Sequence, residues 1–290
     1  MLKFLAKVLG LLYRQVPSPL RPLLKRAFLW SRIRLRGLST GRAVRHGKRI
    51  AFLDFEIAYL EGFEYLGPGP LEVEVFAQCS TVSPGTERAV LCGLPGARRA
   101  FPYHPGYSCA GIVVRAGSAA GAFKPGDNVT GCLRHTSADS VQADQLFQIP
   151  NGVSFEAASF IELGIITLQG VRKARLSPGD RVAILGQGLI GQLANRIVRA
   201  AGAARVIAIA PSGARAPTAL QNGGADEFLQ MRNQAFDPEK IAADIVIEAA
   251  GTPEAIVTAL RCARLGGRVV LLGSSRGISW DIDLGMLLQR

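Results

Sequence analysis

Apolar and polar positions follow two different patterns along the 290 residues, and the change of pattern divides the chain. Between 50 and 150 the apolar runs are short and strand-like, at 71–76, 110–115 and 128–132, with a Gly/Pro turn at 123–127. Short strands at this spacing predict a compact β-barrel-like domain. From 154 the period becomes helical, through 156–173, and strands then alternate with helices.

The alternating part predicts strands at 181–185, 205–209, 244–248 and 268–272, and helices at 189–201 and 253–264. This order is typical of a doubly wound parallel sheet, so the fold class is α/β. We expect three parts: a basic amphipathic extension over 1–48, a β domain over 49–153, and a linking helix with a nucleotide-binding domain over 154–290.

The strand at 181–185 runs directly into Gly186-x-Gly188-x-x-Gly191. Gly186 permits a tight turn, Gly188 lets backbone amides approach a pyrophosphate, and Gly191 lets the next helix pack close to the strand. That helix begins at Leu189 and Ile190, and its N-terminal amides would face the phosphates. Glycines also occur in ordinary turns, but between a strand and a helix they predict a dinucleotide site.

The residues after the second strand of this sheet bear on the choice of nicotinamide cofactor. An acidic residue usually binds the ribose 2′-hydroxyl of NAD there, but this chain has Ala210. Ser212 and Arg215 follow and could bind a 2′-phosphate, although Arg215 could equally be a solvated charge beginning the next helix. We therefore favour NADP(H), with NAD(H) as the alternative.

The net charge of +12 comes from the N-terminal segment, because residues 1–53 hold thirteen Lys or Arg and no acidic residue. Basic amphipathic stretches at 1–14 and 23–36 are separated by Pro17, Pro19 and Pro22. This pattern suits helices in the interface of an anionic membrane, contacted through residues 1–45. A partner-docking or poorly ordered extension and a transit peptide are alternatives. No nucleic-acid partner is expected, because no recognition motif is present.

Composition indicates the compartment. The five cysteines are scattered and form no CxxC pair, which indicates a reducing environment: Cys79, Cys92, Cys109, Cys132 and Cys262. No apolar run is long enough to cross a bilayer, and no cleavage site follows the first one. We expect a cytoplasmic protein, peripheral on the inner face of the membrane.

Several short motifs occur in an order that resembles the medium-chain dehydrogenase/reductase superfamily. The resemblance implies a GroES-like catalytic domain, a Rossmann domain, a nicotinamide cofactor between them, and hydride transfer to or from a carbonyl, alcohol or activated C=C substrate. The motifs are Ser83-Pro84-Gly85-Thr86-Glu87, Pro105-Gly106-Tyr107, Lys124-Pro125-Gly126-Asp127, Ser177-Pro178-Gly179-Asp180, Gly224-Ala225-Asp226, Glu248-Ala249-Ala250-Gly251 and Gly266-Gly267-Arg268-Val269.

The zinc ligands of that superfamily are missing from the matching positions. Pro84 stands where zinc-dependent members have cysteine, and Tyr107-Ser108 stands where they have His-Glu. Only Glu162 remains at a ligand-like position, and a carboxylate that hydrogen-bonds a loop is the preferred interpretation of it. The structural-zinc lobe is missing too, leaving Cys132 alone. Catalytic zinc needs three protein ligands, so we expect no zinc.

Without a metal, protein donors must stabilise the developing negative charge. Tyr107 is the first candidate, because it occupies a former ligand position, and Thr86 is another donor. His104 and His135 are candidates for proton relay, although lone histidines are more often structural.

The chain ends at Arg290, where the superfamily would supply another strand and a return segment. We expect a fragment rather than a divergent ending, and a homodimer would require the complete C-terminus. The basic extension suggests a lipidic small-molecule substrate. Two alternatives remain: a non-catalytic nucleotide-binding scaffold at a membrane, and a pigment-precursor alcohol dehydrogenase. A branch that oxidises bacteriochlorophyll precursors resembles this chain at Gly85-Thr86-Glu87.

Overall fold

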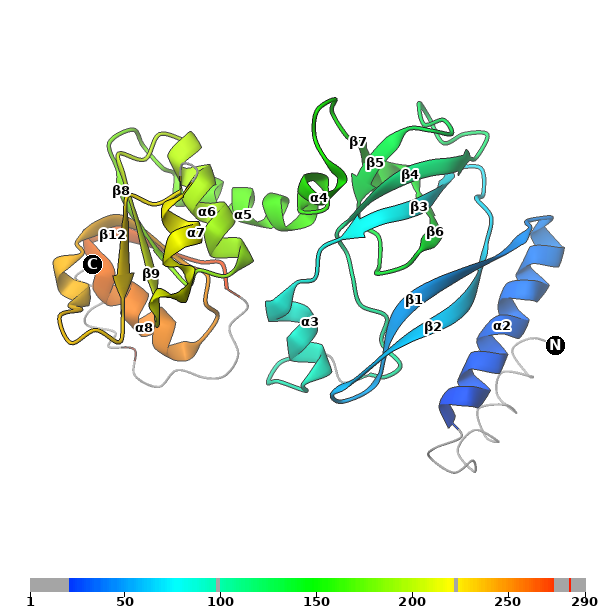
Figure 1. Ribbon diagram of the computed structural model, residues 1–290, viewed down its shortest axis with the longest axis horizontal. Coiled ribbons are helices and arrows are strands. Elements are labelled where there is room, and N and C mark those ends of the chain that lie inside the picture. Colours follow the sequence, from blue (N-terminus) through cyan, green and yellow to red (C-terminus); the bar gives the residue numbers. More distant parts are fainter. Residues whose placement is uncertain (1–20, 98–99, 222–223, 274–281, 283–290) are drawn as a thin grey trace. The chain divides into compact units, whose positions relative to one another are not determined.

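The computed structural model describes residues 21–97, 100–221, 224–273 and 282 (Figure 1). The chain divides into two compact units, one of Met1–Val82 with Arg99–Phe160 and one of Ser83–Arg98 with Ile161–Arg290. The predicted amphipathic stretch at 1–14 and the chain end at 283–290 lie outside the described residues. The three-part division at 48 and 153 stays a prediction.

The first unit is built mainly from antiparallel strands. Five of them form a sheet in the order β6-β3-β4-β5-β7, and β1 and β2 form a separate hairpin beside helix α2 (Figure 1). The elements are α2 (Arg21–Thr40), β1 (Val44–Asp54), β2 (Ile57–Leu66), β3 (Glu72–Ser80), β4 (Cys109–Ala116), β5 (Asn128–Gly131), β6 (Ala138–Gln142), η2 (Ala143–Gln145), β7 (Leu146–Gln148) and α4 (Phe155–Ala158).

The core of this unit follows the alternation seen in the sequence. Val73 and Val75 on β3 pack with Val113 on β4 and Val129 on β5, and all four are buried. The hairpin is less regular, since the first four residues of β2 are all exposed. It therefore lacks the half-buried alternation by which strands are recognised, and the sequence pattern predicts no strand before 71.

The second unit contains a five-stranded sheet in which every pair of neighbours is parallel, in the order β10-β9-β8-β11-β12. The elements are α3 (Pro84–Leu91), α5 (Ile161–Ala174), β8 (Arg181–Leu185), α6 (Leu189–Ala200), β9 (Arg205–Ala210), η3 (Gly213–Arg215), α7 (Ala216–Leu220), β10 (Glu227–Gln230), η4 (Pro238–Lys240), β11 (Ala243–Glu248), α8 (Pro253–Cys262) and β12 (Ala263–Leu271).

Both faces of the parallel sheet are buried. Val182 and Ile184 of β8 belong to one hydrophobic cluster, which includes residues of α6, whereas Ala183 and Leu185 belong to another, which includes residues of α8. Burial on both faces explains why this strand is a continuous apolar run without alternation. The predicted doubly wound α/β fold is confirmed.

One predicted helix is interrupted. The helical pattern at 156–173 forms two helices, α4 and α5, that are separated at Ser159 and Phe160. The Ser159 hydroxyl donates to the Glu156 carbonyl oxygen at 2.8 Å and also lies 2.6 Å from the Thr81 hydroxyl. A side chain that hydrogen-bonds nearby backbone offers an alternative to the helical bonds, and this ends the first helix.

Candidate functional site

In the glycine-rich turn between β8 and α6, two of the three motif glycines are closely packed and the third faces open space. Gly186 has φ +89°, and a Cβ there would lie 2.6 Å from the Ala250 amide nitrogen. A Cβ at Gly191 would lie 1.8 Å from the Gly186 carbonyl oxygen. By contrast, a Cβ at Gly188 would meet no atom within 4 Å. The turn therefore leaves open space where the sequence predicts a pyrophosphate.

Helix α6 begins at this open space. Gly188 is its N-cap and provides no side-chain cap, and its first turn contains no acidic residue. The first amides of a helix lack partners within the helix, and the helix dipole places positive charge at this end. Leu189 and Ile190, both half-buried, form the first turn with Gly191. These backbone donors fit an anionic group.

A buried pair of amide side chains holds the turn against α6. Gln187 donates from Nε2 to the Ile184 carbonyl oxygen at 3.1 Å and accepts at Oε1 from Asn195 Nδ2 at 2.8 Å. Gln187 is 4% exposed and Asn195 is fully buried. Neither residue is predictable from the sequence, because position 187 is unrestricted in the glycine motif and Asn195 lies among apolar helix residues.

The turn lies at the point where the order of strands reverses. Strand β8 is in the middle of the sheet: β9 and then β10 follow on one side of it, and β11 and then β12 follow on the other. Ligands of doubly wound sheets bind in the crevice at this switch point, outside the carboxyl ends of the strands. The Ala249 amide donates to the Leu185 carbonyl oxygen at 2.7 Å, which joins the ends of β11 and β8.

Glu248 ends β11 beside the turn and is fully buried. Its Oε1 accepts hydrogen bonds from the amides of Ala250 and Gly251, both at 2.7 Å, whereas Oε2 has no partner among the described residues. Burial raises the pKa of this carboxyl, and the two amide donors oppose that shift. Glu248 therefore shapes the backbone segment that packs against Gly186.

The end of β9 carries the predicted 2′-phosphate residues. Ala210 is buried and ends the strand, while Ser212 and Arg215 are exposed in and just before the short helix η3. No carboxylate stands at the end of this strand. A Cβ at Gly213 would lie 2.6 Å from Gln230 Nε2, so the end of β10 lines the same loop.

Tyr107 and His135 lie at one corner of the first unit. A Cβ at Gly106 would lie 2.2 Å from the His135 amide nitrogen, which brings the two loops together. The His135 side chain is 9% exposed, and its Nδ1 lies 2.8 Å from the Ser80 hydroxyl. Tyr107 is half-buried. The sequence alone does not predict that the loops of Tyr107 and His135 meet, because the two residues are far apart in the chain.

His104 belongs to a separate cluster of polar side chains that includes residues of the β1–β2 hairpin. Its Nε2 is 3.3 Å from Glu61 Oε1, and Arg49 forms an ion pair with the same carboxylate at 2.7 Å. Burial, with the nearby positive charge of Arg49, lowers the pKa of His104 to about 4, against the opposing effect of Glu61. At neutral pH this imidazole is therefore uncharged. Thr86 belongs to the other unit, in the first turn of α3, and is half-buried.

The positions that match zinc ligands carry other bonds. Ser108 is 1% exposed, and its hydroxyl donates to the Ser159 carbonyl oxygen at 2.6 Å. Glu162 lies in the first turn of α5, and burial raises the pKa of its carboxyl. Proline has no side-chain ligand atom, so Pro84 cannot bind a metal. Within the described residues, no three His, Cys, Asp or Glu side chains form a potential metal cluster.

The sequence is similar to those of known dehydrogenases. The family model for zinc-binding dehydrogenases matches residues 190–290. Sorbitol dehydrogenase of Bacillus subtilis is 28% identical over 59% of this chain, and D-guloside 3-dehydrogenase of Escherichia coli is 30% identical over 60% of it. The matches cover 59% and 52% of those relatives, so the chain spans little more than half of each.

A solved structure resembles most of the chain. It is a protein of Sinorhizobium meliloti 1021 assigned to the zinc-binding dehydrogenases and solved with NADP bound. Its TM-score is 0.75 at 26% identity, covering 84% of this chain and 82% of that one. Together with the glycine turn at the switch point and the antiparallel unit before it, these matches show that the chain is similar in sequence and in fold to zinc-binding dehydrogenases.

Proposed function

We propose that this chain is a zinc-independent oxidoreductase that uses NADP(H) in preference to NAD(H). The observation that carries the proposal is the open, positively polarised turn at Gly188, followed on β9 by Ala210 instead of a carboxylate. A negatively charged residue after β9 would repel a 2′-phosphate, whereas Ser212 and Arg215 can donate hydrogen bonds to it. The substrate is a carbonyl, an alcohol or an activated C=C compound.

When bound, the cofactor would supply or accept the hydride, and the protein would position the reactants. Amides at the start of α6 would hold the pyrophosphate, while Glu248 and Gln187 hold the surrounding backbone in place. The Tyr107 hydroxyl donates a hydrogen bond to the substrate oxygen, and the His135–Ser80 pair relays the proton that this oxygen gains on reduction and loses on oxidation. His104 is held by Glu61, and its uncharged state at neutral pH makes it a weaker candidate for a proton donor.

Titration with NADPH and NADH, followed by nicotinamide fluorescence, tests the proposal. We expect NADPH to bind more tightly, and Gly188→Asp to weaken it by at least about tenfold, because a carboxylate would then face the phosphates. The backbone at Gly188 has φ −77°, which aspartate adopts, so the variant should keep its fold. Gly164→Asp on α5, another uncrowded glycine, is the matched control. Tighter binding of NADH would contradict the cofactor choice.

A non-catalytic nucleotide-binding scaffold is the second candidate. It is favoured by Ser108, whose hydroxyl is used in a buried structural bond instead of in chemistry. NADPH binding without NADPH oxidation across a panel of aldehydes, ketones, quinones and enones would support the scaffold. Turnover that survives exhaustive chelation and is lost in Tyr107→Phe would support the zinc-independent enzyme.

A further inference from the structure

Exposed apolar and basic side chains lie next to one another near the C-terminal end of α2. The helix lies along the β1–β2 hairpin (Figure 1), with Gly37 buried and Arg34 bonded to Glu64 at 2.5 Å. Leu35 and Leu38, by contrast, are 58% and 83% exposed, and Arg36 beside them is exposed as well. Two exposed leucines next to arginine on an anchored helix need a physical explanation.

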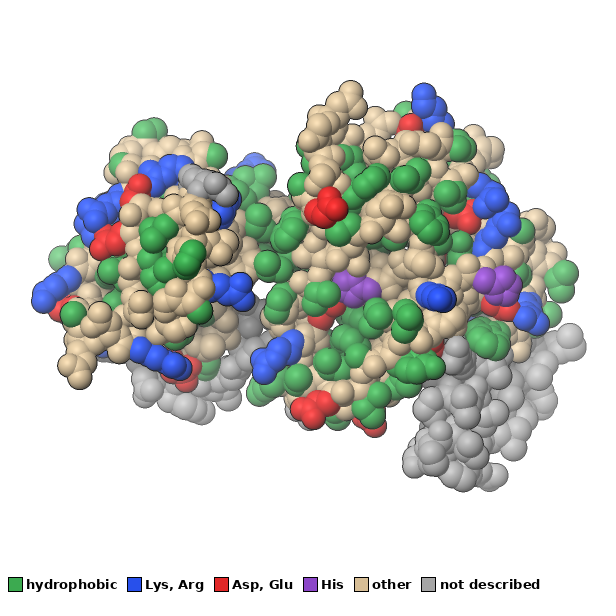
Figure 2. All heavy atoms as spheres, in the orientation of Figure 1, with side chains coloured by type: hydrophobic (Ala, Val, Ile, Leu, Met, Phe, Trp, Pro, Cys, Tyr) green, Lys and Arg blue, Asp and Glu red, His purple; other side chains and the backbone are tan. Residues whose placement is uncertain are grey.

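An arginine-lined groove adjoins the C-terminal end of α2. It has a volume of about 430 Å³, is lined by Arg42, Arg45 and Arg115 among others, and none of the described lining residues is acidic. A second groove, which includes Leu38, shares Gly41–Ala43 with it, so the two are continuous. Glu64 also lines this second groove, where it is paired with Arg34. Figure 2 shows Lys and Arg side chains near this end of the helix.

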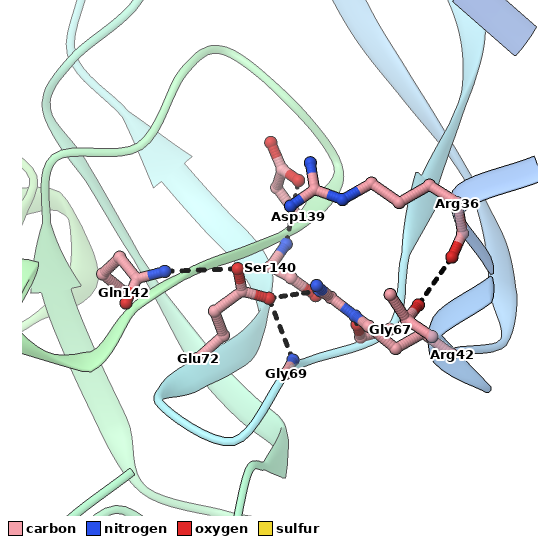
Figure 3. Close-up of polar contacts among 9 residues, drawn as sticks. Arg36, Arg42, Gly67, Gly69, Glu72, Asp139, Ser140 and Gln142 are labelled. Atoms are coloured by element: carbon pink, nitrogen blue, oxygen red, sulfur yellow. Dashed lines mark hydrogen bonds and ion pairs between the residues drawn. The ribbon is translucent and has the colours of Figure 1, made fainter. Parts of the chain in front are cut away.

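The arginines of the groove differ in how their charges are satisfied. Arg42 donates to the Gly67 carbonyl oxygen at 2.7 Å and pairs with Glu72, which also accepts from the Gly69 amide and from Gln142 (Figure 3). Arg115 pairs with Glu74 at 2.9 Å. The buried Nε of Arg45 has no hydrogen-bond partner among the described residues. Arg42 and Arg115 are therefore held in place by carboxylates, and Arg45 is the arginine of this groove that has a donor still without a partner among the described residues.

We propose that the exposed residues Leu35, Arg36 and Leu38 of α2, together with the arginine groove, dock onto an anionic phospholipid bilayer. Leu35 and Leu38 enter the apolar boundary, Arg36 meets the headgroups, and the groove takes a lipid phosphate, for which guanidinium groups have matching geometry. The absence of any acidic residue from 1–53 fits a negatively charged surface. A nucleic acid would offer no apolar environment to the leucines. The proposal is independent of the oxidoreductase function.

Co-sedimentation of the full chain with vesicles tests this docking. We expect binding to phosphatidylcholine vesicles that contain phosphatidylglycerol, little binding to phosphatidylcholine alone, and weaker binding at high salt. Leu35→Ser/Leu38→Ser and Arg36→Gln/Arg45→Gln should each lower the partition coefficient about tenfold or more, because each removes two of the interacting side chains. Leu168→Ser/Arg172→Gln, at exposed positions of α5, is the matched control.

Circular dichroism and thermal unfolding of each variant show whether it remains folded, so that loss of binding is not mistaken for unfolding. Unchanged vesicle binding in both folded α2 variants would overturn the proposal. So would a self-associated chain that becomes smaller in size-exclusion chromatography when Leu35 and Leu38 are replaced, because a second copy would then be the occupant of this face.

Discussion

Different residues around the glycine-rich turn have different tasks: some leave open space, and others fix the backbone that surrounds it. Gly188 leaves space, while Gln187 and Glu248 fix backbone through buried hydrogen bonds. The glycines are predictable from their spacing, since each has a local steric reason. Gln187 and Glu248 are not, because their partners become neighbours only when β8, α6 and β11 pack together.

Glu248→Gln should make the stability of the protein less dependent on pH. Burial raises the pKa of Glu248 in the folded state, so ionisation opposes folding as the pH rises from the unfolded-state pKa through the folded one. Glutamine keeps an oxygen that accepts from the Ala250 and Gly251 amides but carries no charge. In urea unfolding at acidic and at alkaline pH, the free energy of unfolding of the variant should rise relative to that of the wild type as the pH increases. A constant difference would contradict this.

Asn195→Ala should destabilise the protein by about 1–3 kcal/mol, because it leaves the buried Gln187 Oε1 without a donor. NADPH binding should weaken as well, since the turn is no longer held against α6. Chemical denaturation and fluorescence titration measure the two effects. Gln187→Ala and the double variant complete a cycle, and strict additivity of the free energies of unfolding would show that the pair is not coupled.

Among the elements, α2 shows most clearly how charge positions a helix. Its sequence predicts a basic amphipathic stretch at 23–36, and the helix extends over Arg21–Thr40. What the pattern alone could not give is the attachment to the hairpin. Glu64 is 5% exposed, and its partner Arg34 lies thirty residues earlier in the chain.

Arg34→Gln should loosen α2 at neutral pH and have little effect in acid. Hydrogen bonding to Arg34 lowers the pKa of Glu64, so the pair stabilises the fold above the usual glutamate pKa and is lost as the pH falls through the lowered value. Hydrogen exchange of α2 amides at neutral pH and well below the usual glutamate pKa measures this. Arg261→Gln, which breaks the exposed pair with Glu239, is the control and should have little effect at either pH. Equal loosening at both pH values would contradict the assignment.

At the scale of the whole molecule, the two units differ in the direction of neighbouring strands and in how their sheets are buried. The first is antiparallel, and the second is a parallel sheet buried on both faces. No helix among the described residues is long and apolar enough to span a membrane. The proposed cofactor site and the proposed membrane surface belong to different units, so they can be tested separately.

Saturating NADPH should protect amides of the second unit selectively. We expect slower hydrogen exchange at 186–191 and 249–251, because the ligand would cover the amides at the switch point, and no change in the hairpin at 44–66. At one hundred times the dissociation constant the ligand would add about 2.7 kcal/mol to the stability of the unit that binds it. Protection confined to the first unit would contradict the location of the site.

The sequence by itself determined the parallel sheet, the glycine turn between β8 and α6, and the basic character of the N-terminal segment. These depend on local periodicity, on the conformations open to glycine and on charge. Only the tertiary structure decided that β11 lies beside β8, that Glu248 reaches the turn, and that His135 meets the loop of Tyr107. Strand order and loop contacts depend on which buried surfaces fit together across the chain, and no local pattern encodes that fit.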